Sequence, residues 1–421
     1  MAKELNTIQY AGQVSYEQII ISNYNGAKLN ITDLVQEINI YEDLFSNILS
    51  GSIAIVDATS MIDVLPIIGQ ESIKISLAVP GAGIKTFTFS VYSVSNIEAT
   101  NNNTAVYVLN IISNEAIIDR IQGFSKVYSG ESSKIVSTII SDWLPTNKKL
   151  LFESGRNIIK FISPYWSPFE AINYVAARTT HKNTGNPSFF FYETLEGFNF
   201  RSIETLFESA PLATLVYRDS NIALAEKKNN LAQQGLTIED YEVLSSFDFL
   251  ESLNSGILGT EIYSKDVSRN EYTINRYNYL KSYSSSKHLN KFSPIPNTGR
   301  GLNYRNISNK KYIKYTHNEM FTGYGDVLYP NLIFGPRSSL IEQLNTVRLN
   351  ITLPGSIIIN PGKIVDLQFP VNRVKDKVSK SELDTSLSGR YIVSSVRHNI
   401  LSNKHSISAE VLKESLIKEL I

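Results

Sequence analysis

The chain has 421 residues, too many for one ordinary hydrophobic core, so we expect two to four domains. Its 40 lysine and arginine residues balance its 40 aspartate and glutamate residues, so no net charge draws it toward free nucleic acid or anionic lipid. It contains no cysteine, which excludes a disulfide-stapled scaffold and thiolate metal sites. The first residues do not resemble a signal peptide and no apolar run is long enough to span a bilayer, so we predict a soluble protein.

The first part of the chain, residues 1–115, has the pattern of short β-strands separated by polar turns. Asn101–Asn103 are suited to a tight hairpin, because asparagine tolerates a positive φ. We therefore predict a small antiparallel barrel or sandwich here. Its clearest strand candidates are Ser52–Val56, Ser72–Leu77, Thr86–Tyr92 and Ala105–Ile112.

Residues 116–238 change to a mixed pattern. Ser132–Leu144 and Pro168–Thr179 have apolar residues at helical spacing, and a proline follows the first and opens the second. Ser188–Tyr192 and Phe198–Ser202 are typical of two strands joined by a turn. These elements predict a mixed α+β domain.

The last part of the chain contains a polar segment and an amphipathic tail. Residues 286–339 are rich in Ser, Lys, Asn, Tyr and Gly, which predicts an exposed, irregular insertion. In the tail, Leu412, Leu416 and Leu420 lie four residues apart, so we predict a helical segment over 413–421. This helix either packs on its own domain or docks another protein or a neighbouring subunit.

Several segments recur in the same order, which indicates an internal duplication. If they are equivalent, residues 239–285 and 340–412 form a second β-barrel related to the first. The alternative is two unrelated antiparallel barrels whose strands resemble each other by chance. The matching segments are Glu42–Asp57 with Glu251–Asp266, Gly69–Leu77 with Gly362–Phe369, and Val91–Ile97 with Val393–Ile400.

No catalytic or metal-binding signature stands out. Pro80–Thr86 superficially resembles a phosphate-binding loop, but Ile84 replaces the required glycine and the segment connects two strands. Glu193 and Glu196 could form a carboxylate pair for glycan hydrolysis, although we expect solvated turn residues. Trp143 and Trp166 are expected to cap a core. The five histidines show no metal-ligand spacing, so we predict surface positions for most of them. We also predict no cofactor and no enzymatic activity. The histidines are His181, His288, His317, His398 and His405.

Four segments resemble the baseplate hub proteins of contractile-tailed bacteriophages. Tyr41–Asp57 and Leu65–Ile75 are similar to the amino-terminal barrel of that family, and Tyr165–Ala176 with Phe189–Ser202 is similar to its central domain. Related domains occur in the spike proteins of type VI secretion systems. The expected fold is therefore β-rich α+β, with two related antiparallel, tube-like β-barrels flanking a mixed α+β domain and an irregular insertion.

The resemblance implies a structural role in a virion tail assembled in the host bacterial cytoplasm. In that family a homotrimer forms a pseudo-six-fold ring between the six-fold tail tube and the three-fold central spike, with tape-measure and baseplate wedge proteins as further partners. DNA passes through its lumen, and the spike would here be a separate protein. Three alternatives remain open: a tail-associated cell-wall or glycan hydrolase, the hub of a phage-derived injection system, and a barrel that binds single-stranded nucleic acid.

Overall fold

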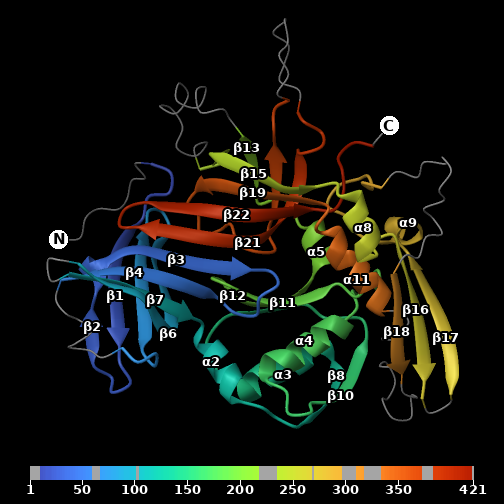
Figure 1. The fold of residues 1–421 in the computed structure, drawn as a ribbon, viewed down its shortest axis with the longest axis horizontal. Coiled ribbons are helices and arrows are strands. Elements are labelled where there is room, and N and C mark those ends of the chain that lie inside the picture. The colour runs from blue at the N-terminus through green and yellow to red at the C-terminus, as the bar shows by residue number, and fades with distance from the viewer. Residues whose placement is uncertain are drawn as a thin grey trace, which may run out of the picture.

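The computed structural model describes residues 10–58, 67–100, 104–217, 235–267, 270–295, 310–316, 333–371 and 383–419. Its main feature is one large β-sheet built from strands of both the first and the last part of the chain. Some helices lie below this sheet, and others lie at its right-hand side near a small separate sheet (Figure 1). No helix in these ranges is long and apolar enough to cross a membrane. The β-rich α+β class predicted from the sequence is confirmed.

The first half of the large sheet, which we call the first sheet unit, comes from residues before Asn114. The strands pair in the order β2-β1-β5-β6-β7-β4-β3. Alternate residues of these strands point inward, so isoleucine, valine and leucine side chains form one buried core. The strands are β1 (Ser15–Ser22), β2 (Lys28–Asn30), β3 (Val35–Asp43), β4 (Ser50–Asp57), β5 (Ser72–Val79), β6 (Gly83–Thr100) and β7 (Thr104–Ile112).

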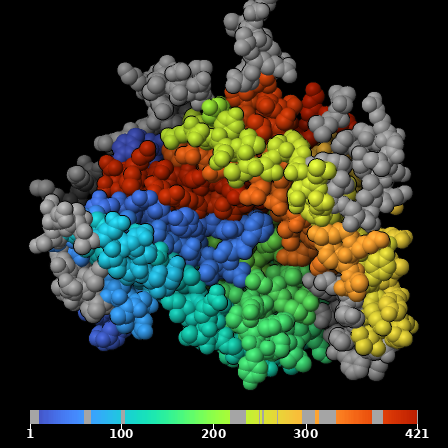
Figure 2. Space-filling view, in the orientation of Figure 1, coloured from blue at the N-terminus to red at the C-terminus, as the bar shows by residue number. Residues whose placement is uncertain are grey.

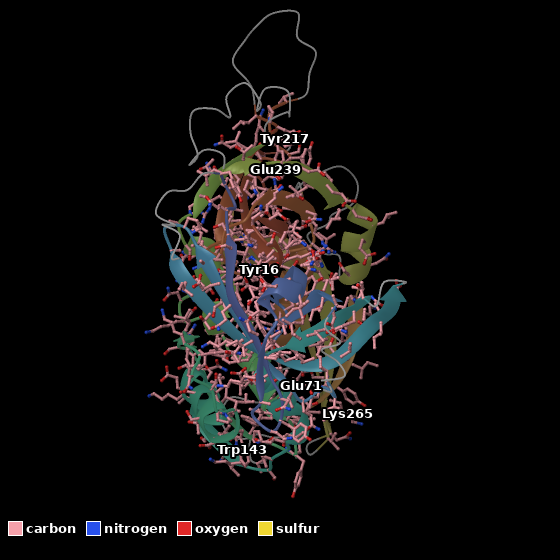
Figure 3. All side chains as sticks on the ribbon, turned by 90° about the vertical axis from the view of Figure 1, so that its left-hand side faces the viewer. Tyr16, Glu71, Trp143, Tyr217, Glu239 and Lys265 are labelled. Atoms are coloured by element: carbon pink, nitrogen blue, oxygen red, sulfur yellow. The ribbon has the colours of Figure 1, made fainter. Side chains whose placement is uncertain are left out.

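The second sheet unit has the order β14-β13-β20-β21, continuing through β22 and β19 to β15. β14 and β15 are consecutive segments separated only by Glu239, so the pairing path returns on itself around a second core. Figure 3 shows Glu239 beside Tyr217, the last residue of β13. The strands are β13 (Ala213–Tyr217), β14 (Thr237–Ile238), β15 (Asp240–Ser246), β19 (Val347–Pro354), β20 (Ile364–Gln368), β21 (Gly389–Leu401) and β22 (His405–Lys413).

The two units repeat one topology. The five strands β5-β6-β7-β4-β3 and β20-β21-β22-β19-β15 have the same order in space, the same order along the chain and the same antiparallel pairing. A β-bulge occurs between Val91 and Ser93 in β6, and another between Val393 and Ser395 in β21. The units differ at β1, which is antiparallel to β5, whereas β13 is parallel to β20.

Two of the three sequence repeats are confirmed as structural equivalents. Gly69–Leu77 contains the turn before β5 and most of β5, and Gly362–Phe369 contains the turn before β20 and β20 itself. Each segment begins with a glycine in the left-handed region, at φ 86° and 84°. Val91–Ile97 and Val393–Ile400 lie in the equivalent strands β6 and β21. The match of Glu42–Asp57 with Glu251–Asp266 is wrong, because the latter segment forms α8 and β16 outside the large sheet.

One antiparallel ladder joins the two units. β21 pairs with β20 through Gly389–Ile392, and β3 occupies the same edge farther along, opposite Ser395–Leu401. Eight antiparallel strands therefore follow one another as β15-β19-β22-β21-β3-β4-β7-β6. Figure 2 shows this order as bands, yellow-green over red, then blue and cyan.

The middle of the chain forms an α+β layer below the large sheet, and both predicted helices are confirmed as α3 and α4. α4 begins with a capping box in which Ser167 and Glu170 exchange hydrogen bonds, and Pro168 occupies its first turn. The two predicted strands are also confirmed, as β11 and β12. The elements are α2 (Asn114–Ile121), β8 (Val127–Glu131), α3 (Ser132–Trp143), β9 (Leu150–Phe152), β10 (Ile158–Ile162), α4 (Pro168–Arg178), β11 (Phe189–Thr194), β12 (Gly197–Ser202) and α5 (Ile203–Glu208).

Residues between β15 and β19 form an arm with its own three-stranded sheet, in the order β17-β16-β18. Segments that we had assigned to the second barrel and to the irregular insertion therefore pair with each other instead. Residues 296–309 and 317–332 of the predicted insertion, which include His317, lie outside the described residues, as do Asn101–Asn103. The elements are α8 (Phe249–Ser255), β16 (Gly259–Asp266), β17 (Glu271–Asn278), α9 (Tyr279–Ser282), β18 (Lys310–Thr316) and α11 (Phe334–Gln343).

The predicted C-terminal helix is wrong over the described residues. Leu412 and Lys413 end strand β22, and Leu416 makes an isolated bridge with Phe292. Lys413 is fully buried: its ammonium donates to the carbonyl oxygens of Ser386 and Ser388, and burial lowers its pKa to about 7. The four-residue leucine spacing thus coincides with a strand and a bridge, both packed on this chain.

Candidate functional site: junctions between the parts of the chain

The ladder between β3 and β21 is reinforced by polar side chains. The guanidinium of Arg397 donates to Asn39 Oδ1 over 2.9 Å, and the amide of Asn399 donates to the same oxygen over 3.0 Å. Asn399 also donates to the carboxylate of Glu37. The hydroxyl of Tyr16 donates to the carbonyl oxygen of Ile400 over 2.8 Å. Main-chain pairing and side-chain bonds therefore hold the two units in one register.

A buried Glu–His–His chain crosses the same junction. Glu42 on β3 lies 2.7 Å from His398 Nε2, and His398 Nδ1 lies 3.0 Å from His405 Nε2. The distances allow the Nε2–H of His405 to donate to His398 Nδ1 and the Nε2–H of His398 to donate to Glu42. The second Glu42 oxygen accepts the backbone N–H of Leu195, which ties the middle layer to the junction. Burial and the neighbouring His398 lower the pKa of His405 to about 3.

A second buried cluster joins the first sheet unit to the middle layer. Lys148 Nζ lies 2.5 Å from carboxylate oxygens of both Glu115 and Glu193. The other Glu193 oxygen accepts bonds from the Ser113 hydroxyl at 2.6 Å and the Leu49 N–H at 3.0 Å. Burial raises the pKa of Glu193, while Lys148 and Ser113 act in the opposite direction.

The hydrolase hypothesis required Glu193 and Glu196 to act on one substrate. Glu193, predicted to be a solvated turn residue, is instead fully buried in β11, next to an open pocket of about 500 Å³. Glu196 lies in the turn and pairs with Lys363 at 3.6 Å. A general acid must reach the atom that it protonates, and both Glu193 oxygens are occupied by partners from this chain. Glu193 therefore connects β11 of the middle layer to residues at the end of the first sheet unit.

The predicted surface positions of the histidines are also wrong. His181, His398 and His405 are buried, and His288 is largely covered where it stacks on Tyr283 and contacts Glu414. Within the described ranges, no three His, Cys, Asp or Glu side chains gather as a metal site would require. Thr184 and Tyr283 are local partners of His181 and His288, but Glu42 and Glu414, which contact His398 and His288, come from segments more than 100 residues away and leave no local signal in the sequence.

The two tryptophans are partly buried and pack against the core of the middle layer. Trp143 stacks on Phe124 and donates to the Tyr128 hydroxyl, and Trp166 packs against Tyr174. Pro80–Thr86 forms the turn between β5 and β6 together with the start of β6, as expected from its sequence.

Of the leucines proposed as an interface, Leu412 and Leu416 are buried against this chain, and Leu420 lies outside the described residues. That they contact another subunit stays a prediction.

No protein-family model matches the chain, and no curated protein sequence is significantly similar to it. Solved structures with the same fold exist. A tail protein from Neisseria meningitidis MC58 matches with a TM-score of 0.54 and 11% identity over 95% of this chain and 97% of its own. The 43 kDa tail protein of prophage MuSo2 from Shewanella oneidensis matches with a TM-score of 0.54 and 8% identity over 94% of this chain and 98% of its own.

The chain has the fold of phage tail proteins. Both matches cover almost the whole of each partner, so the similarity includes the two sheet units and the middle layer together. An Escherichia coli component of the type VI secretion system matches at a lower TM-score of 0.43, with 10% identity over 90% of this chain and 74% of its own. At these identities the similarity concerns fold, and function has to be argued from the molecule.

Proposed function

We propose that this protein is the structural hub subunit of a contractile-tail baseplate. Its two sheet units would be the related, tube-like barrels of that family. Three copies would form a ring of six similar units that mates with a six-fold tail tube on one side and a three-fold spike on the other.

One observation carries this proposal: the same five-strand order occurs twice in one chain, and the copies are joined edge to edge. A chain with two similar units can occupy six similar positions with three copies, which is the property that an adaptor between the two symmetries needs. The shared fold with phage tail proteins supports the same role. The buried Glu193 and His398 clusters support a structural rather than a catalytic purpose.

The proposed partners follow from this position in a tail. They are a second and third copy of the chain, a central spike protein, tail-tube or tube-initiator proteins, the tape-measure protein and baseplate wedge proteins. DNA would pass through the lumen during genome ejection without specific recognition, in keeping with a net charge of zero. A hub of a phage-derived injection system would use the same ring.

Mass measurement of the purified full chain, alone and with its spike, tests the proposal. We expect three copies, and electron micrographs of the particles should show a three-fold ring with six lobes. A chain that remains monomeric at every concentration, with and without the spike, would contradict it. Clearing of bacterial cell walls by the purified protein, abolished by Glu193→Gln, would favour the hydrolase instead.

A further inference from the structure

We propose that copies of this chain join head to tail by strand pairing. The open edge of β15 in one copy pairs with the second half of β6 in the next, and the apolar side chains of Phe247 and Leu250 enter a pocket beside β6. This inference deepens the proposed function, because it names the contact between subunits of the ring. Only the number of copies in the ring rests on the proposed function.

The two ends of the eight-strand run have open edges. β6 pairs with β5 only through Gly83–Ser90, so among the described residues no strand faces Val91–Glu98 on that side. β15 pairs with β19, and no described strand pairs with its other edge. Figure 1 places β15 at the top of the sheet and β6 at the bottom. An unpaired edge presents free N–H and C=O groups and is a template for another strand.

The chain contains its own template for this contact. β21 is the equivalent of β6, and β3 is the equivalent of β15. In β21 the edge beyond β20 is filled by β3. In β6 the corresponding edge beyond β5 is open. Pairing β15 of a second copy with β6 therefore repeats a junction that the chain already makes, with the same antiparallel direction.

The matching bulges fix the register of the proposed pair. Counting from Val91 and Val393, Ser95 corresponds to Arg397, which faces Tyr41 in the junction within the chain. Tyr41 corresponds in turn to Ser245. Tyr41 pairs through β4 with Ile112, and Ser245 pairs through β19 with Leu412, which is the equivalent of Ile112. The proposed contact therefore places Ser95 of one copy opposite Ser245 of the next.

Burial differs between the two ends as this contact requires. Ile40 in β3 is fully buried, whereas Val243, its equivalent in β15, is 43% exposed. Val396 in β21 is buried, whereas its equivalent Val94 in β6 is only half-buried. The exposed apolar residues beside these edges are Tyr92, Ile97, Leu244 and Phe247. Pairing would remove apolar surface from water at both ends.

A pocket beside β6 matches the residues that follow β15. After β3, the N–H of Leu44 donates to the carbonyl of the bulge residue Ser394, and the Leu44 side chain is buried in a core with Ile392 and Leu412. The equivalent place in the first unit lies beside Tyr92 and Ile112. There the surface has an open pocket of about 690 Å³, lined in part by Tyr92, Ile112, Phe45, Ile48, Ile117 and Ile121.

The segment that follows β15 supplies the apolar group for this pocket. Phe247 is the first residue after β15, as Leu44 is the first residue after β3. Leu250 follows three residues later, in α8, and is 72% exposed. A leucine side chain in this pocket would exclude water next to the new strand pair. In protein interfaces, a few residues in such desolvated pockets contribute most of the binding free energy.

Engineered cysteines test the register, because the chain has none of its own. The variant Ser95→Cys with Ser245→Cys should form covalent dimers and trimers on oxidation or with a short bismaleimide, visible on a denaturing gel. The matched control, Tyr41→Cys with Arg397→Cys, should cross-link within one chain and stay at monomer mass. A second control, Ser95→Cys with Tyr272→Cys on β17, should give no cross-link between chains.

The outcomes separate this inference from the proposed function. If mass measurement gives three copies while Ser95 and Ser245 do not cross-link and the control within the chain does, the contact is wrong and the hub proposal stands. If the chain is monomeric at all concentrations, both are wrong. Cross-linking in assemblies of another copy number would support the contact and overturn the trimer.

A substitution of the exposed leucine gives an independent test. Leu250→Asp should weaken association at least tenfold by sedimentation. The carboxylate would lose the apolar contacts of the leucine with residues such as Ile112 and Ile117, and it would lie near Asp119 and Glu170, which line the same pocket. Ile313→Asp, at a residue 75% exposed on the arm, is the matched control and should leave association unchanged. Equal association of Leu250→Asp and the wild type would overturn the role given to the pocket.

Discussion

Glu193 shows how far burial changes the role of a residue. In the sequence it lies beside a glycine turn with another glutamate nearby, a pattern typical of solvated residues. In the structure its carboxylate is enclosed by Lys148, Ser113 and Leu49, which come from segments 45 to 144 residues away. Such partners have no local signature, so sequence reasoning found the residue and missed its environment.

Lys148→Ala should lower the free energy of unfolding by about 3 kcal/mol, because it leaves the buried carboxylates of Glu115 and Glu193 without a counter-charge. Chemical denaturation with matched slopes measures this. Lys126→Ala is the control: its 2.6 Å pair with Asp142 is largely exposed, so we expect little change. Equal effects of the two substitutions would contradict the importance of the buried cluster.

His405 should make stability depend on pH. Its pKa falls from an ordinary 6.5 to about 3 on folding, so between these values the unfolded chain binds one more proton. The free energy of unfolding should therefore decrease as pH falls below 6.5, by up to about 1.4 kcal/mol per pH unit from this group.

The variant His405→Gln cannot take up that proton, so its pH dependence between 6.5 and 4 should be shallower than that of the wild type. Urea unfolding at a series of pH values measures both slopes, and the carboxylates that titrate in the same range are common to both proteins and affect both alike. Parallel curves would show that His405 is protonated equally in the folded and unfolded chains.

At the scale of elements, sequence signals were reliable where residues within one turn of a helix determine where that helix begins. α4 was predicted from its apolar spacing and from the proline in its first turn, and the structure adds a capping box of Ser167 and Glu170 within the same turn. Ser167→Ala should reduce the free energy of unfolding by about 1 kcal/mol, measured by urea denaturation. Thr138→Ala, which removes only an exposed hydroxyl bonded to Lys134 in α3, should have almost no effect, and a larger loss there than at Ser167 would contradict the capping argument.

The predicted C-terminal helix failed because its signal was short. Leu412 and Leu416 fit a helical spacing, but β22 alternates buried and partly buried residues from His405 onward, which is the period of a strand. The strand has partners on both sides in β19 and β21, and their ladder bonds outweigh a leucine pattern of two turns.

At the scale of the whole molecule, the duplication was predictable in part. The repeats around Gly69 and Val91 were found because a glycine turn and a bulge constrain sequence strongly. The third repeat was misplaced: the true counterparts of β3 and β4 are β15 and β19, and the arm from Phe247 to Thr346 separates them. Strand patterns are too weak to be matched across such an insertion.

The ladder between β3 and β21 has a consequence for assembly kinetics. A ring of six units built from single-unit chains loses the translational freedom of five bodies when it assembles, whereas a ring of three fused pairs loses that of two. Half of the junctions would then form at the effective concentration of one folding chain, whatever the number of copies in the cell. Ring formation would follow the third rather than the sixth power of concentration, so a complete ring could assemble from a scarce protein.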